Sequence, residues 1–294
     1  MPLGEKIPLR DSLLRVLTAV VAAPVVLALA WWGDWPFGLL VLAGALLIQW
    51  EVYEMMNAGG GKPRRLLGMI LGALSILSIL VPAVWPLVVV VLLVLIGRIP
   101  FEHVHEDPLV SLADTVFGAV YPTALLGYVL RLRVADGLDI AQSEAFWLTL
   151  SLFFLVWATD TFAYYVGKYF GRQALAPRVS PNKTWEGAAG GLVGTILTAV
   201  VLRVAPLEAF GKTEPVLAFL AWPNVVVLAL ICGILGPLGD LAESKLKRSV
   251  SVEDSGTLLP GHGGLLDRFD SMIFAAPVAY LYLSYVAALF GGVG

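Results

Sequence analysis

The sequence is poor in charged residues and in cysteine, and each shortage argues against a class of protein. Asp, Glu, Lys and Arg make up only 14% of the 294 residues, whereas 59% are hydrophobic. A soluble domain carries roughly 25% charged residues. The single cysteine, Cys232, excludes an intramolecular disulfide. A net charge of -3 leaves no basic excess for binding nucleic acid. The composition therefore argues against a water-soluble enzyme and favours a membrane protein.

Long uncharged runs are what the sequence has in abundance. About 20 apolar residues cross the hydrocarbon layer of a bilayer as a helix. The longest run, 66–97, exceeds one crossing, and we expect Pro82 and Pro86 to divide it into two short helices. The sequence thus predicts an all-α, polytopic integral membrane bundle with about nine transmembrane helices. These are expected at 13–32, 36–56, 66–82, 84–97, 110–130, 145–169, 187–204, 216–239 and 271–290.

Lysine and arginine residues predict the orientation of the chain, because positively charged loops stay in the cytoplasm. With the N-terminus inside, this arrangement puts fifteen of the 19 basic residues on the cytoplasmic side and four on the other. We therefore expect a multi-pass protein of the cell (inner) membrane. Residues 1–140 form a region of plain transmembrane helices, and 141–294 form a catalytic region with cytoplasmic loops at 168–186 and 240–270.

The first of these loops follows a helix that carries Asp160. A carboxylate in a membrane segment is costly, so it marks either a functional site or a buried pairing. After the helix come Ser180, Asn182 and Lys183, in a proline-fixed turn before the next helix. Such a turn suits phosphate oxygens, although an ordinary interfacial turn needs no ligand. The glycines of that next helix have helical spacing, which predicts close helix packing; they are Gly187, Gly190, Gly191 and Gly194.

The second loop carries more chemistry. If the preceding helix continues beyond the membrane, Asp240, Ser244 and Lys247 share one of its faces. Asp267 and Asp270 have i, i+3 spacing at the start of the last helix. Acids at a helix start can serve the helix alone. That reading explains poorly why three aspartates bracket one loop beside several basic residues.

The three aspartates, Asp240, Asp267 and Asp270, are hard oxygen ligands of the kind that Mg²⁺ prefers. Mg²⁺ normally takes one or two carboxylates and leaves its other positions to water and substrate phosphate. We therefore expect Mg²⁺ as the cofactor, neutralising a pyrophosphate leaving group. His262 lies between glycines, and either a proton-transfer role or a turn role fits its position.

The second loop also resembles a known family signature. It reads Ser244-x-Leu-Lys-Arg-x4-Glu-Asp-x-Gly-x2-Leu-Pro-x-His-Gly-Gly-Leu-x-Asp-Arg-Phe-Asp270. This pattern is similar to the signature of the phosphatidate cytidylyltransferases, and the segments around Asp160 and 180–187 resemble that family too. The resemblance covers roughly residues 145–290. One departure is Glu253, where the family usually has lysine.

The resemblance implies transfer of a cytidylyl group from CTP to phosphatidic acid at the membrane bilayer, with release of pyrophosphate. It implies Asp240 and Asp267 as metal carboxylates with Asp270 nearby. The expected catalytic residues are Asp240, Asp267, Lys247 and Arg268. The expected substrate-binding residues are Asp160, Ser180, Asn182, Lys183, Ser244, Arg248, His262, Gly263 and Gly264. A homodimer is compatible with this picture, and the oligomeric state stays open.

The expected chemistry needs no protein nucleophile, because phosphatidate carries its own phosphate oxygen. Positioning and charge neutralisation then suffice for in-line attack on the α-phosphate. Two alternatives remain. A CTP-dependent polyprenol or phytol kinase would transfer the γ-phosphate instead. A transporter would suit the many spans and Asp160, but the polar residues gather at one face and not at the midplane.

Overall fold

The computed structural model describes residues 24–101, 107–207, 212–252, 254–256 and 263–287, and most of these are helical. Short one-turn helices at Pro82–Val84, Ile99–Phe101 and Val120–Ala124 join some of the longer ones. The main helices are α2 (Asp34–Ala58), α3 (Arg65–Leu80), α4 (Trp85–Gly97), α5 (Pro108–Ala119), α6 (Leu125–Arg133), α7 (Gln142–Phe170), α8 (Trp185–Val204), α9 (Trp222–Ser249) and α10 (Leu266–Tyr285). The all-α prediction is confirmed.

Within the described residues, six stretches are long and apolar enough to cross a membrane. They are Asp34–Ala58, Pro82–Phe101, Pro108–Arg133, Gln142–Phe170, Trp185–Val204 and Trp222–Ser249. The expected count of about nine is not confirmed. Residues 13–23 of the first expected span, 13–32, lie outside the described residues, whereas 24–32 are helical. Helix α3 is apolar but has only 16 residues, and α10 begins with charged residues that lower its mean hydropathy.

Three prolines lie where one helical segment gives way to the next. The predicted division of the run 66–97 is confirmed, because α3 ends at Leu80 and a new helical turn begins at Pro82. Pro86 does not break a helix; it lies in the first turn of α4, where its missing N–H costs nothing. Pro122 lies in the π-helical turn Val120–Ala124 between α5 and α6. A proline cannot donate the usual helical hydrogen bond, and the wider π-helical turn accommodates its ring.

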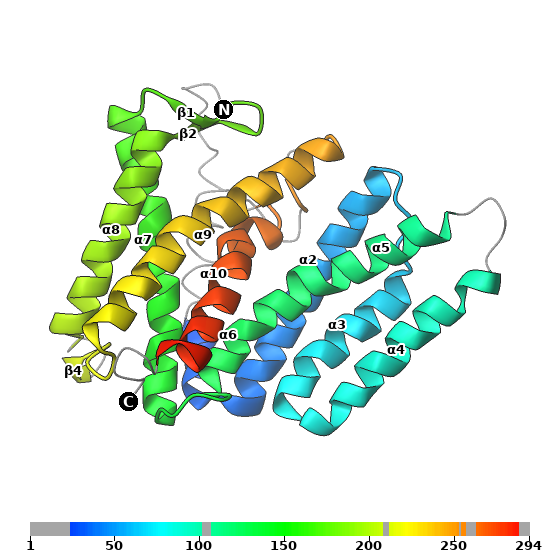
Figure 1. Cartoon of the computed structure of the whole chain (residues 1–294), viewed down its shortest axis with the longest axis horizontal. Helices are drawn as coiled ribbons and strands as arrows, with labels where there is room; N and C mark the ends of the chain where they lie inside the picture. The colour runs from blue at the N-terminus through cyan, green and yellow to red at the C-terminus, as the bar shows by residue number, and fades with distance from the viewer. Residues whose placement is uncertain (1–23, 102–106, 208–211, 253, 257–262, 288–294) are drawn as a thin grey trace.

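The helices lie side by side across the molecule (Figure 1). Helices α7 and α8 stand at one end of the molecule, α3 and α4 at the other, and α2, α6, α9 and α10 between them. The apolar core runs through these middle helices, with Ile48, Leu130 and Ile273 fully buried in it. Helix α10 therefore packs on α9 and also against the N-terminal helices α2 and α6.

Close packing of α8 on α7 agrees with the spacing of the α8 glycines. A side chain at Gly190 would meet Val166 of α7 at 2.5 Å, and one at Gly191 would meet the Thr159 carbonyl at 2.9 Å. The absence of side chains at these positions lets the two backbones approach. Thr159 and Thr195 then hydrogen-bond across the contact at 2.6 Å. The predicted close packing is confirmed.

The segment 168–186, expected as a polar loop, contains the end of α7 and a β-hairpin. Strand β1 (Ala174–Ala176) pairs antiparallel with β2 (Ser180–Thr184), and Thr184 then caps α8 by accepting a hydrogen bond from the Gly187 N–H. A second short hairpin, β3 (Pro206–Leu207) with β4 (Lys212–Pro215), lies at the other end of α8 from the first (Figure 1). The first hairpin follows the C-terminal end of α7, and its Lys183 reaches Asp240 of α9.

Candidate active site

Three carboxylates from two helices converge where α9 packs on α10. Asp240 and Glu243 lie one turn apart on α9, and Asp270 lies on α10; each offers an oxygen within 4.8 Å of the others. Glu243 and Asp270 are only 1% and 8% exposed. A side chain at Gly239 would collide with the Asp270 carbonyl, so this glycine allows the close approach. Such a concentration of acid at a buried position suits a bound cation.

The predicted helical continuation through Asp240, Ser244 and Lys247 is confirmed, since α9 runs from Trp222 to Ser249. Ser244 hydrogen-bonds Asp240 at 3.3 Å, as the i, i+4 spacing predicts. Lys183 from strand β2 forms an ion pair with the other oxygen of Asp240. Asp160 on α7 lies within electrostatic range of both Asp240 and Lys183. The first polar loop and the second therefore meet at Asp240.

Lys247 lies between two carboxylates. Its Nζ atom is 2.9 Å from Glu243 and 2.6 Å from Asp267, and its side chain is only 14% exposed. The other oxygen of Asp267, Oδ2, accepts hydrogen bonds from the Gly264 N–H at 2.9 Å and from the Ser255 hydroxyl at 3.0 Å. Burial raises the pKa of the Asp267 carboxyl, but hydrogen bonds with Glu243, Lys247 and the Gly264 N–H, together with the charge of Lys247, outweigh it and lower the pKa to about 2.

Asp267 thus has a different environment from the other two aspartates that the sequence singles out. Asp240 and Asp270 belong to the three-carboxylate cluster, whereas Asp267 directs its oxygens to Lys247 and the loop before α10. Glu243 stands in the cluster in its place. Lys247 connects the two environments, because it pairs with both Glu243 and Asp267.

The remaining candidate residues lie on the strand, helices and loop that supply the residues above. Ser180 is half-buried and Asn182 exposed on β2, and Arg248 and Arg268 are exposed near the ends of α9 and α10. Gly263 has a φ of 77°, a conformation that favours glycine. A side chain at Gly264 would collide with the Ser255 hydroxyl. These glycines therefore fit the loop tightly around Asp267, while His262 and Glu253 lie outside the described residues.

The cluster fits a divalent metal on chemical grounds. All three groups are carboxylates, the hard oxygen ligands that Mg²⁺ takes. Oxygen Oε1 of Glu243 is buried and accepts no hydrogen bond from the described residues. A buried acceptor without a donor is costly, and a cation would satisfy it. Asp240, Glu243 and Asp270 could therefore hold the ion.

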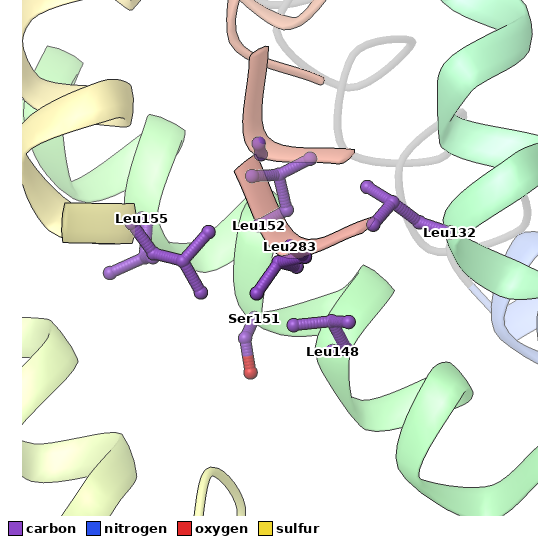
Figure 2. A pocket seen from close by; sticks show the side chains of 8 residues that line it. Leu132, Leu148, Ser151, Leu152, Leu155 and Leu283 are labelled. Carbon is purple, nitrogen blue, oxygen red and sulfur yellow. The ribbon is translucent and has the colours of Figure 1, made fainter. Parts of the chain in front are cut away.

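A separate pocket lies among α6, α7, α9 and α10 and is lined almost entirely by leucine (Figure 2). Its lining residues are Leu132, Leu148, Ser151, Leu152, Leu155, Leu228, Ala279 and Leu283. The one polar group, the Ser151 hydroxyl, donates to the Trp147 carbonyl at 2.7 Å. The pocket thus offers no charged or free polar group to a nucleotide, and the chemistry belongs to the acidic cluster.

Comparison with known proteins gives the family. The model of the cytidylyltransferase family matches residues 13–286, nearly the whole chain. The chain belongs to this family. The phosphatidate cytidylyltransferase of Synechocystis is 32% identical, over 92% of this chain and 95% of that protein. The protein of the same name from Bacillus subtilis is 33% identical, over 93% and 98%. One from Brucella abortus (strain 2308) is 36% identical, over 91% and 92%.

This cytidylyltransferase is a nucleotidyltransferase enzyme with several apolar helices that indicate a membrane setting. Two buried acidic residues are absent from the sequence-based candidates: Glu243 in the cluster, and Glu51 of α2, which contacts the start of α10. Glu243 lies three residues after Asp240, a spacing that would have put it on the same helical face. Glu51 lies inside an expected membrane span, where a charge is itself a signal.

Proposed function

We propose that this enzyme transfers a cytidylyl group from CTP to phosphatidate, giving CDP-diacylglycerol and pyrophosphate. The proposal rests on relatives named phosphatidate cytidylyltransferase that align along nearly their whole length. The observation that carries the mechanism is the cluster of Asp240, Glu243 and Asp270, with two lysines paired to its members. Nucleotidyl transfer needs that combination of metal ligands and cations.

In this mechanism Asp240 and Glu243 on α9 and Asp270 on α10 would hold Mg²⁺. When bound, the ion polarises the α-phosphate and neutralises charge on the leaving pyrophosphate. Lys183 and Lys247 bind phosphate oxygens as compact charges. Each is paired with a carboxylate in the structure, so each lysine would have to turn from its carboxylate to contact a substrate phosphate. Asp267 would hold Lys247 in place through their ion pair. Its expected role as a metal ligand stays a prediction.

The proposed substrate site also includes Arg248, Arg268 and Asp160. The two arginines are exposed, at positions suited to the triphosphate or the lipid phosphate. Ser180 and Asn182 on β2 offer hydrogen bonds next to Lys183. The site lies at one end of the bundle, where a soluble nucleotide and a lipid headgroup can both reach it. We propose that this end faces the cytoplasm and that the bundle spans the cell membrane.

The proposed site is complete within one chain, because all three carboxylates and both lysines come from the same protomer. A homodimer is therefore compatible with the mechanism but not required by it.

The direct test uses purified protein in detergent with CTP and phosphatidate. We expect pyrophosphate release that requires both substrates and Mg²⁺, together with a lipid product that contains cytidine. A well-folded preparation that releases no pyrophosphate with both substrates present would overturn the proposal.

A further inference from the structure

Glu51 is a buried acid that the mechanism above does not use. It lies on α2, in the N-terminal part of the chain, and is only 2% exposed. A buried carboxylate is stable only when hydrogen bonds or opposite charges compensate it. Its partners come from residues more than 200 positions later in the sequence, around the start of α10.

Both oxygens of Glu51 bind the backbone where α10 begins. Oε1 accepts from the Leu265 N–H and Oε2 from the Leu266 N–H, each at 2.8 Å. The first N–H groups of a helix have no partner within the helix. Leu265, the residue at the cap position, supplies no side-chain acceptor of its own. Glu51 therefore caps α10 from a different helix, and its negative charge suits the helix N-terminus.

The same carboxylate connects to Asp267 through Ser255. The Ser255 hydroxyl lies 3.3 Å from Oε2 of Glu51 and 3.0 Å from Oδ2 of Asp267. Its single proton can serve only one of them at a time, and the Ser255 N–H also points to Asp267 at 3.3 Å. Side chains at Gly256 or Gly264 would come within 3 Å of Glu51 oxygens. The loop is thus built around the Glu51 carboxylate.

We propose that Glu51 is a positioning residue of the active site. By fixing the first turn of α10 and the Ser255 segment, it holds Asp267 toward Lys247, and Lys247 in turn contacts Glu243 of the acidic cluster. This inference rests on the proposed function. It assigns an active-site role to a helix of the N-terminal region, which the sequence marks only as plain membrane spans.

Glu54, one turn further along α2, provides a matched control. It is exposed and pairs with Arg65 at 2.5 Å, away from α10. The Glu51→Gln variant keeps the side-chain volume but retains only one acceptor oxygen, so one of the two backbone N–H groups loses its partner. The Glu54→Gln variant makes the same chemical change on the same helix without touching the loop.

The experiment measures hydrogen exchange of the amides in residues 263–270, kcat, and the Mg²⁺ concentration that gives half-maximal rate. For Glu51→Gln we expect at least about tenfold faster exchange at these amides, because charge-assisted hydrogen bonds are lost. We also expect kcat to fall by at least about tenfold, with a higher Mg²⁺ requirement. The Glu54→Gln variant should match the wild type in all three.

Faster exchange with unchanged kcat and Mg²⁺ dependence would overturn the proposal, since Glu51 would then be only a helix cap. Unchanged exchange would overturn it as well. If Glu51→Gln does not fold, Ser255→Ala decides, because it deletes only the hydroxyl between Glu51 and Asp267. A wild-type kcat in Ser255→Ala would then contradict the inference, and a reduced kcat would support it. A wild-type enzyme without cytidylyl transfer would instead refute the proposed function, which separates the two failures.

Discussion

Replacing Glu243 with glutamine tests the metal site most selectively, because this residue enters the cluster from the structure alone. The change keeps the volume of a side chain that is 1% exposed. It removes the charge of one of the three carboxylates within 4.8 Å of one another. Lys247 loses the negative charge of its partner at 2.9 Å but keeps the carboxylate of Asp267 at 2.6 Å. The fold should therefore survive while the affinity for the ion falls.

The expected loss follows from what the ion does. Removing one group that stabilises transition-state charge in a buried site costs roughly a hundredfold to a thousandfold in kcat. A hundredfold corresponds to about 2.7 kcal/mol at 1.36 kcal/mol per factor of ten. We expect Glu243→Gln to lose at least about a hundredfold in kcat at ordinary Mg²⁺ and to recover part of it at high Mg²⁺.

The assay is steady-state pyrophosphate release as Mg²⁺ is varied, on protein whose thermal melting matches that of the wild type. Glu214→Gln serves as the control, since Glu214 is exposed on β4, which lies at the end of α8 away from the hairpin β1–β2 (Figure 1). A folded Glu243→Gln enzyme with wild-type kcat and wild-type Mg²⁺ dependence would refute the assignment of Glu243 to the metal site.

Three further predictions concern the rest of the site and its orientation. Asp270→Asn should lower kcat by roughly a hundredfold or more without unfolding the protein, and a near-normal kcat would remove Asp270 from the metal site. Lys183→Ala should lose at least about tenfold in kcat/KM, because a charge-assisted bond is lost, whereas Lys62→Ala should lose little; equal small effects would leave Lys183 with a topological role only. A single cysteine at Gln173, in a background without the native cysteine, should react with an impermeant maleimide only from the cytoplasmic face, and one at Asp139 only from outside. The reverse pattern would overturn the proposed orientation.

Much of the local structure was predictable from the sequence. The uncharged runs predict apolar helices because an unbroken helix satisfies its own backbone in lipid. The continuation of α9 through Lys247, and with it the contact of Ser244 with Asp240, follows from helical spacing. The approach of α8 to α7 follows from the glycine pattern. Each of these depends on residues close together in the sequence.

What the sequence could not supply were contacts between distant segments. The pairing of Asp267 with Lys247, and its absence from the three-carboxylate cluster, depends on how α10 packs against α9. The role of Glu51 depends on a contact across more than 200 residues. The predicted count of nine spans is not confirmed by the described residues, because the length of an uncharged run does not fix the length of its helix: α3 has only 16 residues.

The central claim is transfer of the α-phosphoryl group of CTP, with its cytidine, to a lipid phosphate. Two parallel reactions with phosphatidate, one with CTP labelled at the α-phosphate and one with CTP labelled at the γ-phosphate, test it directly. The account predicts that the α-label enters the lipid and the γ-label leaves in pyrophosphate, both only with a divalent metal. Transfer of the γ-label to the lipid, with release of CDP, would contradict the account.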